Sequence, residues 1–92
     1  MRFWFKLWKD TRLKRDLTVE RNEKDTRTHK VFHALEEAAH AFDLTPPIWL
    51  DKNIKDFKRA SRCRFDQDSF LEPLEYDHLE MIVLEEDEDG TF

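Results

Sequence analysis

Glycine is nearly absent from this sequence: its 92 residues include one, Gly90, close to the C-terminal end. Motifs that cradle a phosphate or hold a nucleophile on a sharp turn need several glycines at fixed spacing. Dinucleotide-binding, P-loop and GxSxG motifs are therefore excluded. Ser61 and Ser69 lie in no nucleophile motif, and the many carboxylates mark no pocket that the sequence reveals. We predict a protein that is not an enzyme and that carries no cofactor.

Cysteine is limited to Cys63. A single cysteine excludes an internal disulfide, a zinc ribbon and a CxxC redox pair. The flanking Arg62 and Arg64 would lower the pKa of an exposed thiol, but alternation with Phe65 predicts that the side chain points inward. We interpret Cys63 as a reduced core residue.

Long hydrophobic runs are missing as well. The apolar N-terminal stretch MRFWFKLWKD is interrupted by Arg2, Lys6 and Lys9, so it predicts neither a signal peptide nor a membrane span. We expect a cytoplasmic protein with no membrane contact. Hydrophobic residues make up 39% of the chain and aromatic residues 13%, which suffices for one packed core in a chain of single-domain length.

Basic residues are absent after Arg64. The chain up to that position has 16 basic and 10 acidic residues, whereas the rest adds 11 acidic ones, so the net charge is -5. Five consecutive acidic residues, 85–89, predict that a single domain over 1–84 is followed by an acidic, flexible tail over 85–92. We expect the other late acidic residues to face the basic ones within the fold, and only residues 85–89 to stay free of pairing.

Hydrophobic periodicity predicts the α+β class. Period-two alternation indicates a hairpin and an edge strand, and helical spacing indicates one main helix that ends before Pro46. A second, shorter helix begins at Asp51 or Asn53. The final strand is apolar at nearly every position, as a central strand covered on both faces would be. The predicted architecture is a small antiparallel-rich sheet packed on the main helix, with strands at 2–8, 13–20, 62–66 and 79–84 and the main helix at 28–43.

Cations alternate with aromatic rings on the polar face of the first strand, and more cations follow on the second helix and its exit. Single-stranded nucleic-acid binders use such a face, where rings stack on bases and cations meet phosphates. An acidic net charge repels a polyanion, however, and Ile54 and Phe57 of the second helix are expected to cover this face. The candidate binding residues, for a protein partner or a nucleic acid, are Arg2, Trp4, Lys6, Trp8, Lys55, Lys58, Arg59 and Arg62.

Three histidines and a glutamate share one stripe of the main helix. On a wheel of about 100° per residue, His33, Glu36 and His40 lie within about 40° of His29, and the apolar residues centre far from them. Histidines at i and i+4 can reach one metal ion, so the stripe is a candidate metal site. A straight helix cannot surround an ion, and a solvated face is the competing interpretation.

Trp49 follows Pro46-Pro47 and Ile48 in an apolar anchor that is either a core plug or an exposed hot spot. We favour the core. An exposed apolar patch formed by Trp4, Trp8 and Trp49 would instead indicate a homodimer or a partner site.

The stretches DTRTHKVFHALEEA, PIWLDKNIKDFKR and FDQDSFLEPLEYDHLEM resemble short uncharacterised proteins of Clostridia-type bacteria, some of them linked with mobile elements. The resemblance covers most of the chain. It implies a bacterial cytoplasmic setting, and it implies no activity, cofactor or catalytic residue.

The leading hypothesis from the sequence is a small non-enzymatic interaction module, which contacts another protein through segregated basic and acidic surfaces. Single-stranded nucleic-acid binding through the aromatic and basic strand face is one alternative. Metal binding on the histidine stripe is another.

Overall fold

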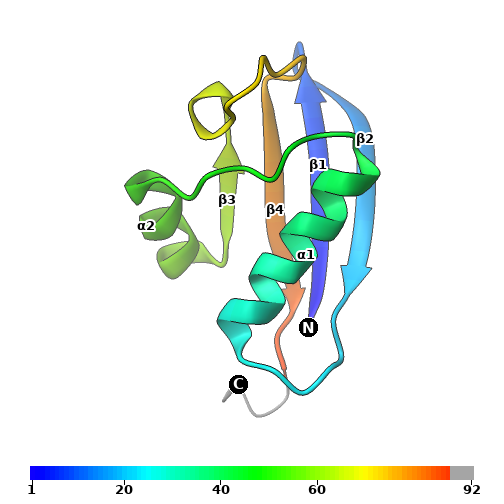
Figure 1. The fold of residues 1–92 in the computed structure, drawn as a ribbon, viewed down its shortest axis with the longest axis vertical. Helices are drawn as coiled ribbons and strands as arrows, with labels where there is room; N and C mark the ends of the chain where they lie inside the picture. Colours follow the sequence, from blue (N-terminus) through cyan, green and yellow to red (C-terminus); the bar gives the residue numbers. More distant parts are fainter. Residues whose placement is uncertain (88–92) are drawn as a thin grey trace.

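A computed structural model describes residues 1–87 of the chain. It confirms the predicted α+β class, with an antiparallel sheet, one main helix and a shorter second helix. The elements in chain order are β1 (Arg2–Lys9), β2 (Arg12–Glu20), α1 (Arg27–Ala41), α2 (Asp51–Ala60), β3 (Arg62–Phe65), the 3₁₀ turn η1 (Gln67–Ser69) and β4 (His78–Glu85), as Figure 1 shows.

The sheet has the strand order β2-β1-β4-β3 and is antiparallel throughout. Phe5 of β1 lies opposite Leu17 of β2 on one side and Met81 of β4 on the other. Met81 in turn lies opposite Cys63 of the edge strand β3. Because side chains alternate across a strand, these residues share one face, and this face forms the core.

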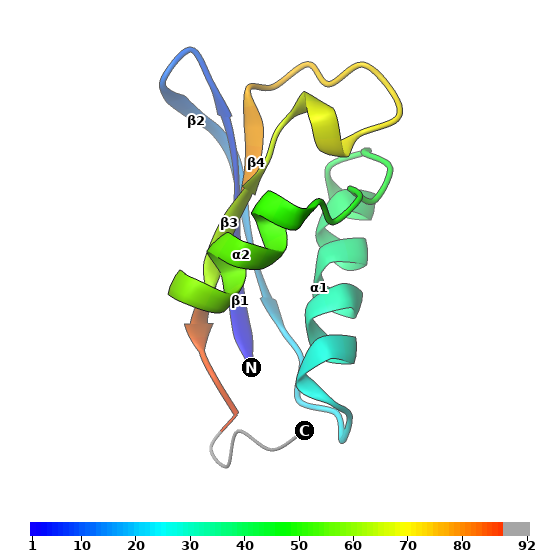
Figure 2. The same cartoon turned by 90° about the vertical axis from the view of Figure 1, so that its left-hand side faces the viewer.

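Helix α1 packs its apolar stripe on that face (Figure 2). The helix begins because the Thr26 hydroxyl accepts a hydrogen bond from the His29 backbone N–H at 3.1 Å, which satisfies a free amide of the first turn. Val31, Leu35 and Ala38 recur at helical spacing and are at most 3% exposed. They pack in one cluster with the fully buried side chains of β1.

Four residues take left-handed backbone angles without glycine: Asp10, Thr11, Asp43 and Ser61. Asp10 and Thr11 form the two-residue loop between β1 and β2, which requires positive φ at both positions. Just after α1, the Asp43 N–H donates to the His40 carbonyl and the Leu44 N–H donates to the Ala39 carbonyl. This Schellman arrangement turns the chain sharply away from the helix axis.

Helix α2 lies beside β3 at the sheet edge, where Figure 2 shows it in front of the strands, with α1 to one side of them. The expectation that Ile54 and Phe57 cover the Trp4 and Trp8 face is wrong. Phe57 is buried against Trp49, with ring centroids 5.6 Å apart, and Ile54 is 39% exposed. Trp49 also packs against the buried Phe65, so its contact with Phe57 places that ring on the core side of the sheet.

The face opposite α1 has no helix over it within the described residues (Figure 2). The expectation that β4 is covered on both faces is thus also wrong. The apolar Ile82 that suggested a second cover is half-buried among neighbouring side chains of the sheet.

A buried amide fixes α2 to the sheet. Asn53 is 1% exposed, and its Oδ1 accepts the Leu50 N–H at 3.0 Å and the Ser69 hydroxyl at 3.2 Å. Its Nδ2 donates to the Arg64 carbonyl at 2.7 Å. One side chain therefore joins the start of α2, strand β3 and η1.

Most late acidic residues fold back onto the basic part of the chain. The expectation that the acidic run stays free of pairing is wrong for residues 85–87, which all form ion pairs. Residues 88–92 lie outside the described part. The ion pairs that join the two parts are Arg2–Glu85, Arg27–Glu86, Lys30–Asp87, Lys52–Asp66, Lys52–Asp68, Arg62–Glu80 and the pair of the N-terminal ammonium with Asp87.

Neither helix in the described part of the chain has the length and apolar character that a membrane span requires.

Candidate interaction surfaces

The uncovered sheet face, defined here as the outward side chains of the four strands, carries the predicted Trp4, Lys6 and Trp8. Both indoles are half-buried, and the Lys6 ammonium lies 3.7 Å from the Trp4 ring centroid and 5.7 Å from that of Trp8. The Trp4 indole donates to Asp16 at 3.0 Å. The rings are therefore held by cation–π and hydrogen-bond contacts within the sheet itself.

Glu80 stands at the centre of this face and is 4% exposed. Burial alone would raise the pKa of its carboxyl, but hydrogen bonds from Arg62 and Trp8 and the positive charges of Arg62 and Lys6 lower that pKa below its ordinary value. The Trp8 indole donates to Glu80 at 3.1 Å and stacks on His78. Burial, followed by the charge of Arg64, lowers the pKa of His78.

Charge on this face alternates from strand to strand. The register sets Asp16 of β2 opposite Lys6 of β1, Lys6 opposite Glu80 of β4, and Glu80 opposite Arg64 of β3. Opposite charges on neighbouring strands attract one another, so the face is a self-neutralising ladder. The outward charged residues are Asp16 and Glu20 on β2, Arg2 and Lys6 on β1, Glu80 and Glu85 on β4, and Arg62 and Arg64 on β3.

This ladder predicts a negative result with nucleic acid. Adding a single-stranded oligonucleotide at about 0.15 M salt should change the tryptophan fluorescence of the wild type by no more than that of a Trp4→Phe variant. The reason is that the carboxylates of β2 and β4 repel phosphates, and that the Lys6 ammonium already lies over the two indole rings where a base would stack. Saturable quenching that Trp4→Phe abolishes would instead establish the nucleic-acid hypothesis.

Of the predicted cations of α2, Arg59 lines a pocket with Arg62 and Glu80 of the sheet face, whereas Lys55 and Lys58 do not line it. Lys55 and Lys58 are exposed and form no ion pair within residues 1–87, while Arg59 pairs with Asp56 on the same helix. Arg62 belongs to the sheet face through Glu80. The eight candidate residues are therefore divided between the sheet face and α2.

An apolar groove of about 220 Å³ runs between α1 and α2. Phe32 of α1 and Ile54 of α2 are 43% and 39% exposed, and Trp49 and Phe57 form its floor. The sequence interpretation missed this groove. A signal was present, because Phe32 falls outside the apolar stripe of α1 and had no role in the predicted core.

Trp49 packs edge-on against Phe65 at 5.0 Å between ring centroids and also contacts Phe32 and Phe57. Trp49 is half-buried: its ring packs against the buried cluster, as the core interpretation predicted, and it also lines the groove. Trp49 lies on the opposite side of the sheet from Trp4, so these rings form no common patch.

The histidine stripe lies on α1 as predicted, with His29, Glu36 and His40 exposed. His29 is engaged by Asp25 at 2.7 Å, and its ring lies 6.2 Å from that of His33. Across residues 1–87, no group of three or more His, Cys, Asp or Glu side chains is placed to hold a metal ion. The described residues therefore add no further metal ligand beside the predicted stripe on α1.

Cys63 is buried and points inward, as predicted. Burial, followed by the charge of Asp56, raises the pKa of its thiol to about 12. The thiol therefore stays protonated at neutral pH, and a thiolate is the form that a nucleophile requires.

Comparison of the chain with protein-family models, curated proteins and solved structures gave no match.

Proposed function

We propose that this protein is a small non-enzymatic interaction module that binds an acidic, apolar segment of another protein in the groove between α1 and α2. The observation that carries the proposal is the combination of exposed Phe32 and Ile54 with the unpaired cations Lys55 and Lys58. Apolar patches rimmed by polar residues are typical of protein-binding sites, and aromatic floors supply most of their affinity.

Charge complementarity selects the occupant. Lys58 lines the groove and Lys55 lies on the same exposed helix, so their positive charge favours carboxylates on the partner. Arg27, at the other wall, already holds Glu86 through two hydrogen bonds of 2.9 Å. A carboxylate at the groove edge is therefore compatible with the geometry, and apolar side chains of the same segment would contact Ile54 and Phe32.

The first test uses the anionic, apolar dye 1-anilinonaphthalene-8-sulfonate as the probe. Ile54→Glu should weaken dye binding at least five-fold, because it places a negative charge in an apolar site. Leu71→Glu is the matched control, since Leu71 is 87% exposed and lies outside the groove. Equal dye binding by the wild type and Ile54→Glu would contradict the proposal.

The second test identifies the partner. A protein captured from the host lysate by the wild type and by Leu71→Glu, but not by Ile54→Glu, should cross-link through a segment that contains both acidic and large apolar residues. A captured segment that is basic, or capture that is equal for all three proteins, would overturn the assignment of the groove.

A further inference from the structure

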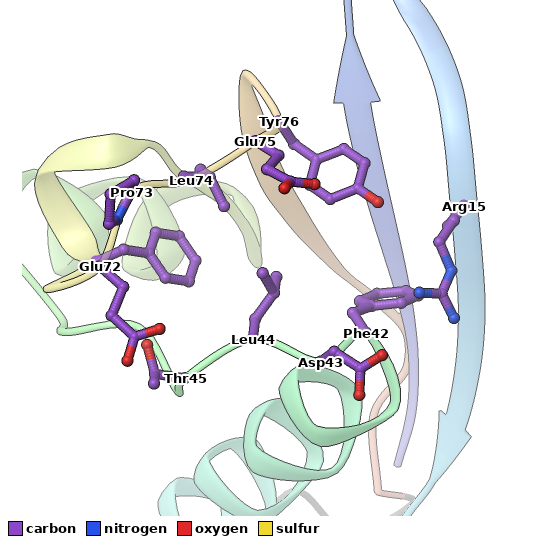
Figure 3. Close-up of a pocket in the computed structure, with 11 residues that line it drawn as sticks. Arg15, Phe42, Asp43, Leu44, Thr45, Glu72, Pro73, Leu74, Glu75 and Tyr76 are labelled. Carbon is purple, nitrogen blue, oxygen red and sulfur yellow. The ribbon is translucent and has the colours of Figure 1, made fainter.

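A second pocket, of about 330 Å³, lies at the C-terminal end of α1, away from the groove. Figure 3 shows Leu44 and Leu74 pointing toward each other across it, with Glu72 and Thr45 on one side and Tyr76 on the other. The volume is within the usual range for small-ligand sites. The pocket is therefore large enough for an organic group.

Aromatic rings form part of the wall, and carboxylates surround the opening. Phe42 and Phe70 are buried, and Tyr76 is half-buried. The acidic residues Asp43, Glu72 and Glu75 are exposed and form no ion pair within residues 1–87. Ring faces and carboxylates both attract a cation, and the adjacent C-terminal end of α1 adds the negative end of a helix dipole.

One cation in the pocket already shows this mode of contact. The Arg15 guanidinium lies 5.0 Å from the Phe42 ring centroid and donates to the Ala41 carbonyl at 3.2 Å. Figure 3 shows it beside the Phe42 ring at one end of the pocket. Arg15 is thus engaged with α1, and the carboxylates of Asp43, Glu72 and Glu75 outnumber this one cation in the pocket lining.

We infer that this pocket binds an alkylammonium or guanidinium group, which stacks against the aromatic wall while Glu72 and Glu75 balance its charge. A metal ion fits less well, because no three carboxylate, histidine or cysteine side chains within residues 1–87 converge on one point. The inference does not rest on the groove, which is a separate surface. The group belongs either to a free polyamine or to a lysine or arginine side chain of a protein.

The test is titration of ¹⁵N-labelled protein with n-butylammonium at about 0.15 M salt. We expect saturable shifts of the Leu44 and Tyr76 amide signals, and no saturable shift with the neutral n-butanol. Glu72→Gln combined with Glu75→Gln should raise the dissociation constant at least five-fold. The control, Glu20→Gln combined with Glu36→Gln, changes the net charge equally at exposed sites outside the pocket and should leave the constant unchanged.

Two further probes identify the source of the group. Tighter binding of spermidine indicates a free polyamine, and tighter binding of an acetylated Gly-Lys-Gly or Gly-Arg-Gly amide indicates a protein side chain. The inference is overturned if butylammonium gives no saturable shift, if butanol binds equally, or if the control variant weakens binding as much as the pocket variant.

Discussion

Asn53→Ala is expected to lower the free energy of unfolding by about 3–5 kcal/mol, because it removes the buried amide and leaves its three buried or part-buried hydrogen bonds unmade. The partners in these bonds are the Leu50 N–H, the Arg64 carbonyl and the Ser69 hydroxyl. In a domain of this size the loss corresponds to a fall in melting temperature of about 12 °C or more. Urea and thermal unfolding measure both quantities.

Asn22→Ala is the matched control, since Asn22 is exposed in the loop before α1. Its unfolding free energy should stay within about 0.5 kcal/mol of the wild type. If Asn53→Ala proved as stable as Asn22→Ala, the buried amide would not be what joins α2 to β3 and η1.

Glu80→Gln is expected to lower the free energy of unfolding by about 1.5–3 kcal/mol at pH 7, since an amide replaces the charged acceptor of Arg62 and Trp8. The loss should depend on pH. The pKa of Glu80 is lower in the folded protein than its ordinary value of 4.5, so the carboxylate stabilises the fold above that value. This contribution disappears as the pH falls through the lowered pKa.

The wild type and Glu80→Gln should therefore differ most above about pH 5 and become similar under more acidic conditions. Urea unfolding at a series of pH values measures the difference. Glu20→Gln, on the exposed edge strand of the same face, serves as the control and should show little difference at any pH. A gap for Glu80→Gln that stays constant from pH 7 to pH 3 would disprove the role of its charge.

Local periodicity predicted the strands and helices well. Alternation identified β1 because it buries one face, and it located β2 although Val19 is buried and Leu13 is 43% exposed there. The spacing of Val31, Leu35 and Ala38 identified α1 because its stripe meets the buried face of β1. Such patterns report which side of an element is buried. They do not report which neighbour buries it.

The position of α2 illustrates this limit. Ile54 and Phe57 were correctly assigned to a helix, but its side of the sheet depends on Trp49 and on the hydrogen bonds of Asn53, which connect residues distant in the sequence. The groove escaped prediction for the same reason, because Phe32 and Ile54 come together only in three dimensions. The pocket likewise combines the end of α1 with the loop before β4.

Among residues 1–87, β4 is the last strand along the chain, although it lies between β1 and β3 in the sheet. A nascent chain that stops before residue 78 consequently has no partner for β3 and leaves one edge of the hairpin open. Residues 1–77 contain 16 basic and 15 acidic residues, so the net negative charge comes from residue 78 onward. The strand that joins β1 to β3 and the acidic excess of the chain are thus both supplied by the part that begins at residue 78.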